Sequence, residues 1–229
     1  MNNIAQHLQL VQNRIAKAAS ESSRPVGEIG LLAVSKTKPI ADIEQAYAAG
    51  QRQFGENYVQ EAIEKIPQLT HKCPDICWHF IGPLQSNKSR QVAEHFDWVQ
   101  TVDRLKIAQR LSEQRPAHLP PLNICLQVNV SGEANKSGVA PTEAAALAAS
   151  VIGLPRLRLR GLMAIPEHTD DLARLEHQFM ELKQLFDKMA EKYPDVDTLS
   201  VGMSEDLELA VACGSTLVRV GTAIFGTRN

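Results

Sequence analysis

The sequence is poor in several features, and each shortage excludes a class of protein. The formal net charge is only −2, so the chain has no basic field that would attract nucleic acid or an anionic membrane. No apolar run is long enough to span a bilayer. The first residues, MNNIAQHLQL, lack the basic and apolar regions of a secretory signal. We therefore expect a cytoplasmic protein that contacts neither nucleic acid nor membrane.

Cysteine is also scarce, with four residues that are scattered along the chain: Cys73, Cys77, Cys125 and Cys213. Only the first two lie close together, and no second cysteine pair or histidine pair accompanies them. This spacing does not suit a zinc site or a disulfide framework. We expect reduced, idle thiols and no metal ion.

What the sequence does contain is an alternation of two patterns. Apolar runs typical of buried strands recur at Ile29–Ser35, Gln53–Gly55, Trp78–Ile81, Trp98–Val102, Leu122–Val130, Leu157–Ile165, Thr198–Val201 and Thr216–Val220. Helical patterns lie between them, for example at Ile40–Ala49, Gln85–His95, Leu105–Arg115, Pro141–Ile152, Leu172–Lys192 and Glu205–Ala212. An amphipathic pattern over Ile4–Ser20 predicts an extra helix before the first strand.

Strands that alternate with helices predict an α/β fold with a parallel sheet. Eight such units in a chain this short favour a closed (β/α)8 TIM barrel that occupies residues 1–229 as one domain. A doubly wound open sheet is the alternative. That fold usually has a glycine-rich turn after its first strand, whereas this chain has SKTKP there.

The first strand ends in a lysine that calls for an explanation. Alternation puts Leu32, Val34 and Lys36 on one face of that strand. A lysine in a buried row is costly unless it is paired, solvated or used in chemistry. In such barrels the chemistry lies at the C-terminal strand ends. We interpret Lys36 as the functional residue and Lys38, next to Pro39, as solvated.

Two later strand ends predict an anion site. Ser204 precedes the helical pattern Glu205–Ala212 as its N-cap, and Gly221 and Thr222 form a second strand-to-helix turn. Loops after strands seven and eight of such barrels commonly bind phosphate, although each turn by itself could be an ordinary capped turn. Arg219 shares a face with Gly221, and a buried arginine there needs either a carboxylate or a ligand atom as acceptor.

A strand-end lysine, two phosphate turns and an inward arginine suit a phosphorylated aldehyde bound as a Schiff base. Asn57 and Ser200 also lie near strand ends and could contact a ligand, with loop capping as the plain alternative for Asn57. Met163 shares a face with Gly161 and Leu159, which favours barrel packing, although it could also touch a ligand ring.

Outside this set, His79 is interpreted as a packed, hydrogen-bonded histidine. The alternating arginines of the sixth strand, Arg156, Arg158 and Arg160, are expected to pair with helix acids.

Six segments together resemble the pyridoxal phosphate homeostasis protein family, also called the proline synthetase co-transcribed homologue family: LLAVSKTKP, FGENYVQE, WHFIGPLQSNK, LRGLMAIP, LSVGMSEDLE and VRVGTAIFG. The resemblance implies the fold-type III barrel of alanine racemase, with pyridoxal 5'-phosphate (PLP) carried as an aldimine on Lys36. It further implies a phosphate held around Ser204, Gly221 and Thr222, and a pyridine nitrogen that faces Arg219.

The resemblance also implies a carrier rather than an enzyme. Arginine disfavours a protonated ring nitrogen, which weakens the ring as an electron sink. We expect no counterpart of the second domain that gives the racemase its catalytic tyrosine. We expect a monomer with no established turnover that buffers PLP, or delivers it transiently to PLP-dependent apo-enzymes, and so affects amino-acid and vitamin B6 balance.

Two other functions stay open at this point. A small PLP-dependent racemase or lyase would need a second acid or base opposite Lys36, and no convincing one stands out in the sequence. A Schiff-base aldolase on the same barrel would use the lysine without an aromatic cofactor, and would be colourless when purified.

Overall fold

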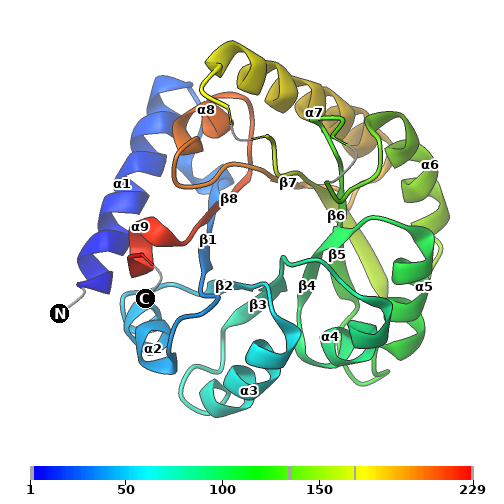
Figure 1. Cartoon of the computed structure of the whole chain (residues 1–229), viewed down its shortest axis with the longest axis horizontal. Coiled ribbons are helices and arrows are strands. Elements are labelled where there is room, and N and C mark those ends of the chain that lie inside the picture. Colours follow the sequence, from blue (N-terminus) through cyan, green and yellow to red (C-terminus); the bar gives the residue numbers. More distant parts are fainter. Residues whose placement is uncertain (1–2, 134–135, 168, 228–229) are drawn as a thin grey trace.

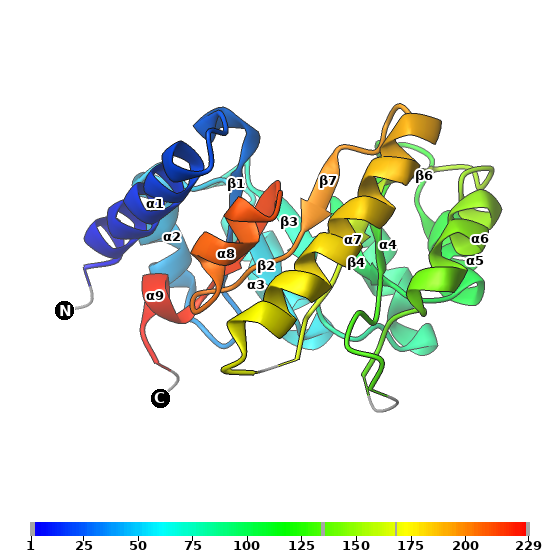
Figure 2. The ribbon, with the colours of Figure 1, turned by 90° about the horizontal axis from the view of Figure 1, so that it is seen from above.

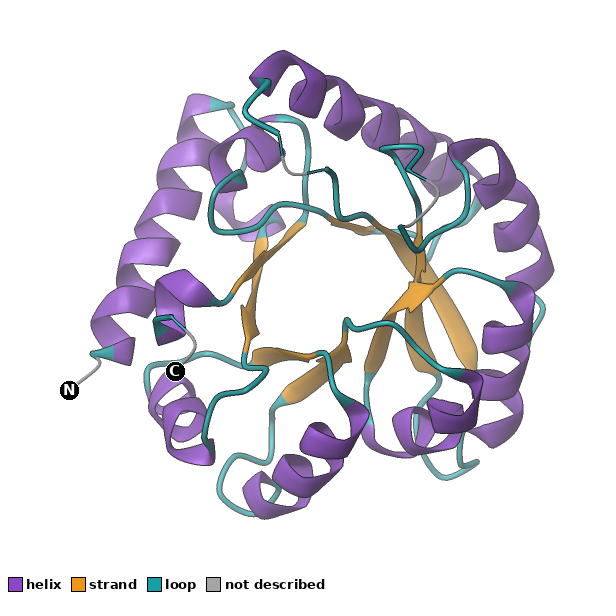
Figure 3. Cartoon of the chain, viewed as in Figure 1, coloured by secondary structure: helices purple, strands orange, loops and turns teal. Residues whose placement is uncertain are grey.

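The computed structural model describes residues 3–133, 136–167 and 169–227. In this part of the chain, eight parallel strands close into a barrel in sequence order, because the last strand also pairs with the first (Figure 3). The strands are β1 (Gly30–Val34), β2 (Gln53–Glu56), β3 (Cys77–Phe80), β4 (Trp98–Val102), β5 (Leu122–Gln127), β6 (Leu157–Met163), β7 (Thr198–Ser200) and β8 (Leu217–Val220). The predicted closed barrel is confirmed.

Helices follow the strands and form an outer ring around them (Figure 1). They are α1 (Ile4–Glu21), α2 (Ile40–Ala48), α3 (Val59–Leu69), α4 (Ser89–His95), α5 (Leu105–Gln114), α6 (Pro141–Val151), α7 (Leu172–Lys192), α8 (Leu207–Ala212) and α9 (Thr222–Phe225), with 3-10 turns η1 (Val26–Glu28) and η2 (Ser86–Lys88). The main apolar core joins strand residues such as Phe54 to helix residues such as Leu182. The core therefore lies between the two rings.

The predicted N-terminal helix is α1, which packs against α8, α9 and α2 outside β1 (Figures 1 and 2). It buries Ile4, Leu8, Val11 and Ile15, which are spaced three or four residues apart and so lie on one face. Full burial of each such side chain stabilises the fold by roughly 1.5–3 kcal/mol. Asn3 caps the helix by accepting the N–H of Gln6. This packing ties the start of the chain to its last two helices.

The interior of the barrel contains a small apolar cluster of Leu32, Ile81 and Leu217, against which Val34 packs. Gly55 of β2 makes room for it, since a Cβ there would lie 3.1 Å from side-chain atoms of both Leu32 and Ile81. Among the other buried residues of the strands are polar side chains from β3, β4, β7 and β8. The barrel is therefore not packed with apolar side chains throughout.

The sixth strand changes phase midway, which the alternation pattern did not predict. Its register with β5 slips by one residue after Leu159. As a result, Leu159 and Leu162 both belong to the main core between the rings. Gly161 makes the bulge possible: its φ is 152°, and a Cβ there would lie 1.8 Å from the carbonyl oxygen of Thr198. The expectation that Met163 shares a face with Leu159 is wrong.

Two further observations concern the described ranges only. None of the helices found there has the length and apolar character needed to cross a bilayer. Nor do the same residues contain a group of three or more His, Cys, Asp or Glu side chains arranged to hold a metal ion.

Candidate functional site

Lys36 lies just beyond β1, at the mouth formed by the C-terminal strand ends. Val34 below it packs against the interior cluster, so the half-buried lysine continues an inward row. Thr37 adopts a φ of 62°, a left-handed conformation that β-branched residues rarely take. The N–H of Lys38 closes the turn on the carbonyl of Ser35 at 3.1 Å. A tight, strained turn thus fixes where the lysine leaves the strand.

Three charged side chains support this turn: Glu56 at the end of β2, and Glu61 and Lys65 of α3. The Lys65 ammonium donates to the carbonyl of Ser35 at 3.1 Å and to Glu56 Oε1 at 3.2 Å. It also contacts Glu61 Oε1, which accepts the N–H of Thr37 at 2.6 Å. The hydroxyl of Ser35 donates to Glu56 Oε1 at 2.7 Å. The backbone on both sides of Lys36, at Ser35 and Thr37, is therefore bonded to one buried ionic cluster.

Within this cluster, the carboxylate of Glu56 is fully buried. Burial raises the pKa of Glu56, and the Lys65 ammonium and the Ser35 hydroxyl partly oppose that rise. Its second oxygen, Oε2, has no hydrogen-bond partner in the described structure. A buried ion pair adds little net stability, but removal of one partner leaves an uncompensated charge. The cluster is therefore sensitive to the loss of Lys65.

Lys38 is half-buried and bonded to the protein, whereas the sequence was interpreted as placing it in solvent. Its ammonium donates to the carbonyls of Phe225, Gly226 and Thr227 at 3.2, 3.1 and 2.8 Å. All three of its N–H donors are therefore used. Alternation along β1 could not reveal this contact, because the acceptors come from the far end of the chain.

Arg219 lies inside the barrel on β8, level with Leu32 of β1 in the sheet register. It is 4% exposed, and its guanidinium donates to Ser200 O at 2.6 Å, Ser200 Oγ at 2.8 Å and Ala164 O at 2.8 Å. These acceptors are neutral, so the carboxylate that the sequence left open is not among them. Burial lowers the pKa of Arg219 to about 10, so it remains a cation at neutral pH. Two of its five N–H groups make none of these bonds.

Ser200 holds Arg219 and is itself held by Gln100. The single hydroxyl proton of Ser200 goes to Gln100 Oε1 at 2.6 Å, so the serine accepts from Arg219. All three side chains are buried. The structure therefore brings Ser200 to Arg219 as a positioning contact. Gln100 was missed by the sequence analysis, although a glutamine inside the apolar run Trp98–Val102 was a visible signal.

His79 continues this polar chain on β3. Its Nδ1 accepts from the Gln100 side-chain amide at 3.0 Å, and its Nε2 lies 3.4 Å from Cys77 Sγ. The ring stacks on Trp98 with centroids 5.0 Å apart. Burial lowers the pKa of His79 to about 3, so the ring is neutral. The structure shows the packed, hydrogen-bonded histidine that the sequence suggested.

Asn57 follows β2 at the same mouth, and its amide oxygen Oδ1 is buried with no hydrogen-bond partner in the described structure. Its backbone lies against Gly82, where a Cβ would come within 2.1 Å of the Asn57 carbonyl oxygen. A buried acceptor without a donor destabilises a protein by about 1–3 kcal/mol. A ligand donor at the mouth would satisfy this oxygen.

The predicted turn after β7 differs from expectation in one respect. Ser204 is not a helix N-cap, because α8 begins at Leu207 with Asp206 in the cap position. The carboxylate of Asp206 instead accepts the N–H of Met203 within the turn. The carbonyl of Ser204 accepts a hydrogen bond of 2.9 Å from Arg14 of α1. The turn is therefore held from outside by the N-terminal helix.

The turn after β8 lies close to β1, the strand that leads to Lys36. Gly221 directly follows β8 as the N-cap of α9, and Thr222, which is exposed, begins α9. A Cβ on Gly221 would lie 3.3 Å from the carbonyl oxygen of Val34 and 3.4 Å from its Cβ. The glycine thus allows the ends of β8 and β1 to touch, two residues before Lys36.

Met163, the last residue of β6, is fully buried and pairs in register with Ser200 of β7. The carbonyl of the next residue, Ala164, accepts from Arg219. The ends of β6, β7 and β8 therefore meet around the guanidinium. Of the predicted site residues, Met163, Ser200 and Arg219 form one group, and Lys36 and Gly221 lie at the ends of the two adjoining strands β1 and β8.

The two arginines on β6, Arg158 and Arg160, form ion pairs, but not with helix acids, and Arg156 precedes the strand. Arg158 and Arg160 pair with Asp195 and Asp197, which lie in the connection between α7 and β7. Arg156, with a φ of 60°, donates to a carbonyl of α5 at 2.8 Å. Register explains the difference, because the start of β7 runs beside β6 and brings these acids within reach.

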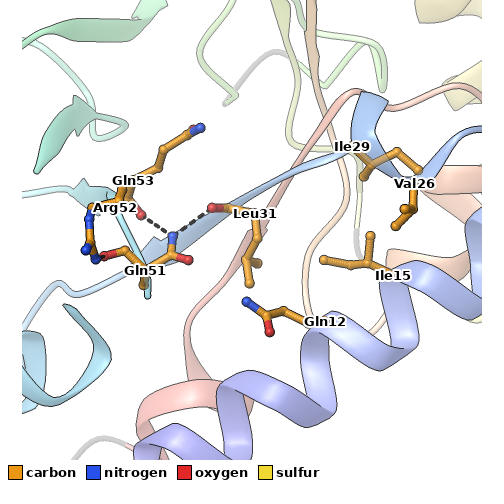
Figure 4. Close-up of a pocket in the computed structure, with 8 residues that line it drawn as sticks. All are labelled: Gln12, Ile15, Val26, Ile29, Leu31, Gln51, Arg52 and Gln53. Atoms are coloured by element: carbon orange, nitrogen blue, oxygen red, sulfur yellow. Dashed lines mark hydrogen bonds between the residues drawn. The ribbon is translucent and has the colours of Figure 1, made fainter. Parts of the chain in front are cut away.

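A pocket of about 310 Å³ lies away from the mouth, between α1 and the N-terminal ends of β1 and β2 (Figure 4). Its lining includes Gln51, whose amide donates to the carbonyls of Leu31 and Gln53. Arg52, also in the lining, pairs with Asp75 at 2.7 Å. None of the predicted site residues lines it. The chemistry predicted from the sequence belongs to the mouth and not to this pocket.

Comparison with known proteins identifies the family. Residues 6–229 match the family model described as alanine racemase, N-terminal domain. The chain is 55% identical over 228 residues to the pyridoxal phosphate homeostasis protein of Pasteurella multocida, covering 99% of this chain and 98% of that protein. It is 57% identical to the protein of the same name from Pseudomonas aeruginosa, over 100% of this chain and 97% of that protein.

This chain belongs to the pyridoxal phosphate homeostasis protein family. The resemblance drawn from the sequence motifs is confirmed. PipY of Synechococcus elongatus, solved with PLP bound, matches with a TM-score of 0.82 and 39% identity, over 97% of this chain and all of that chain. An alanine racemase from Clostridium difficile matches with a TM-score of 0.78 at 15% identity. It covers 99% of this chain but 57% of the racemase, and shows a shared barrel fold.

Proposed function

We propose that this homeostasis protein binds PLP at the barrel mouth and buffers or delivers it within the cell. The observation that carries the proposal is the order of groups on β1 and β8. Arg219 is level with Leu32, Gly221 touches Val34, and Lys36 stands one step above. The Arg219 cation, the closely packed Gly221 and the Lys36 amine thus follow one another along the paired strands β1 and β8 towards the mouth. PipY, a relative of known structure, is described with PLP bound.

The residues present fit this cofactor. Among the described residues Asn57 Oδ1 is a buried acceptor that lacks a donor, and two N–H groups of Arg219 lie outside its hydrogen bonds to protein atoms. In the proposal, the amine of Lys36 condenses with the aldehyde and one water leaves. The turns at Ser204, Gly221 and Thr222 hold the phosphate. When bound, PLP supplies a conjugated ring that can withdraw electrons from an attached amino group.

The polar chain behind Arg219 supports a carrier without turnover. The guanidinium is cationic and has no lone pair for a proton, so it keeps a facing ring nitrogen unprotonated. His79 is neutral, with a pKa near 3, and its Nδ1 is occupied by Gln100. It is therefore a poor base for amino-acid chemistry. We further propose a monomer in the cytoplasm that meets PLP-dependent apo-enzymes transiently.

The proposal is tested by the absorption spectrum of the purified protein before and after borohydride, followed by peptide mass mapping. We expect a coloured PLP adduct that becomes fixed on the Lys36 peptide, and no fixed adduct at that peptide in Lys36→Ala. Modification found mainly on Lys38, or on any lysine other than Lys36, contradicts the assignment. A protein that binds no PLP at all contradicts the function and leaves the aldolase as the better candidate.

A further inference from the structure

The ammonium of Lys38 connects two ends of the chain. It lies in the turn after β1 and donates to the carbonyls of Phe225, Gly226 and Thr227 at 3.2, 3.1 and 2.8 Å. The first of these residues ends α9, and the other two follow it. A lysine at this place satisfies carbonyls that a helix end leaves without partners. One cation therefore holds the C-terminal side of α9 against the turn that carries Lys36.

The segment Gly221–Phe225 depends on such partners for its position. A helix of one turn has little stability of its own. Its other attachments are the His7 ring of α1, which donates to the carbonyl of Ile224 at 3.0 Å, and the buried side chains of Ile224 and Phe225. Gly221 lies against Val34. Among these contacts, Lys38 supplies three hydrogen bonds from a charged donor, the stronger kind of protein hydrogen bond.

The same turn carries both lysines. The N–H of Lys38 bonds to the carbonyl of Ser35, so Lys36 and Lys38 belong to one closed turn. Movement of the segment Gly221–Phe225 relative to Lys38 changes its distance from Lys36 as well. The contact of Lys38 with the end of α9 therefore sets the spacing between the Lys36 amine and the β8–α9 turn. Lys38 itself bonds to neither of these two groups.

We propose that Lys38 is a positioning residue that makes the site selective for a phosphorylated aldehyde over its unphosphorylated form. It does so by holding the segment Gly221–Phe225 at the distance that allows one ligand to reach both Lys36 and the phosphate turn. This inference rests on the proposed function, since it assumes that the ligand is PLP. A ligand without phosphate needs only the lysine and gains nothing from the spacing.

The test compares the dissociation constants of PLP and of pyridoxal for the full-length wild type and for Lys38→Met. The quantity of interest is the ratio of the pyridoxal constant to the PLP constant, because it cancels any change in the reactivity of Lys36. In Lys38→Met we expect this ratio to fall by a factor of about ten, from the loss of the charged hydrogen bonds. Lys38→Arg keeps the cation and should retain a ratio within about twofold of wild type.

Lys72→Met is the matched control, since it also removes one cation. Lys72 pairs with Glu44 at 2.7 Å, and its side chain is 69% exposed. The ratio of the pyridoxal constant to the PLP constant in Lys72→Met should equal that of the wild type. If Lys38→Met does not fold, Lys38→Gln replaces it, because the amide can still donate to some of the carbonyls and should give an intermediate ratio.

An unchanged ratio in Lys38→Met or Lys38→Gln overturns the inference, as does an equal loss of affinity for both ligands. The second result would assign Lys38 to the general fold of the turn. A wild type that fails to bind PLP would instead overturn the proposed function, so the two failures are distinguishable.

Discussion

At the scale of single residues, the site depends on polar groups whose partners are fixed inside the barrel. Among the described residues Arg219 donates to neutral acceptors, and Ser200, Gln100 and His79 follow behind it in one hydrogen-bonded chain. A charged guanidinium in this position is preorganised, because its orientation is set before any ligand arrives. Its effect on a ligand should therefore depend on its charge as well as on its hydrogen bonds.

Replacement of Arg219 by Gln should weaken the retention of PLP. A charged donor becomes neutral, and the loss of a charge-assisted hydrogen bond of about 1.5–3 kcal/mol corresponds to roughly ten- to a hundredfold in the dissociation constant. PLP content after dialysis measures the effect. Arg160→Gln is a suitable control, because Arg160 pairs with Asp197 and stacks on Trp98. Equal retention in Arg219→Gln and wild type would remove Arg219 from the site.

Replacement of Arg219 by Glu should change the chemistry as well. A carboxylate can stabilise a protonated ring nitrogen and so strengthen the ring as an electron sink. In this variant we expect slow deuterium exchange at Cα of added alanine if PLP still binds, and little exchange in the wild type. Rapid exchange or racemisation by the wild type would favour the enzyme alternative.

At the scale of elements, the β1 turn is held between α3 on one side and α9 on the other. Lys65 and Glu61 of α3 bond to the backbone of Ser35 and Thr37, and Lys38 bonds to the end of α9. A left-handed Thr37 persists only where surrounding contacts compensate for its strain. The ionic cluster and the Lys38 contact together provide that compensation.

Lys65→Met should lower the free energy of unfolding by up to about 3–5 kcal/mol at pH 7, because Glu56 loses its buried cation. Burial already raises the pKa of Glu56 above the value of an unfolded carboxyl, and the loss of Lys65 raises it further. The folded state then binds a proton more tightly than the unfolded state. The destabilisation by Lys65→Met is therefore fully present above the pKa of Glu56 in the folded state. It disappears as the pH falls towards the pKa of Glu56 in the unfolded state.

Urea unfolding at pH 7 and pH 5 measures this difference, which should be smaller at pH 5. Lys72→Met serves as the exposed control and should differ little from the wild type at either pH. A Lys65→Met defect that grows as the pH falls would show that Glu56 is not the group responsible.

At the scale of the whole molecule, closure of the barrel creates the site. Pairing of β1 with β8 puts Leu32 beside Arg219, although these residues lie far apart in the chain. The N-terminal helix strengthens this closure, since Arg14 bonds to the turn after β7 and His7 bonds to α9. A ligand that bridges Lys36 and the β8 turn should therefore stabilise the folded molecule as a unit.

Thermal unfolding with and without PLP tests this coupling. At a PLP concentration about a hundred times the dissociation constant, the stabilisation is about 2.7 kcal/mol. That corresponds to a rise in Tm of roughly 5–10 °C for a chain of this size. Lys36→Ala should fold, because a half-buried residue at a strand end leaves no large core cavity, and should lose most of the shift. The same shift in both proteins would place the bound PLP elsewhere.

The sequence by itself determined the class of fold, the N-terminal helix and the positions of Lys36, Arg219 and Gly221 at strand ends. Those features follow from local periodicity, which the chain displays without reference to its partners. Only the tertiary structure decided which side chains and backbone groups contact one another. The bulge in β6 breaks the alternation from which Met163 was expected to share a face with Leu159. Helix α8 begins two residues later than the sequence pattern predicts, and Lys38 donates to carbonyls at the other end of the chain. Hydrogen bonds between distant segments depend on strand register and barrel closure, and neither is visible in a local pattern.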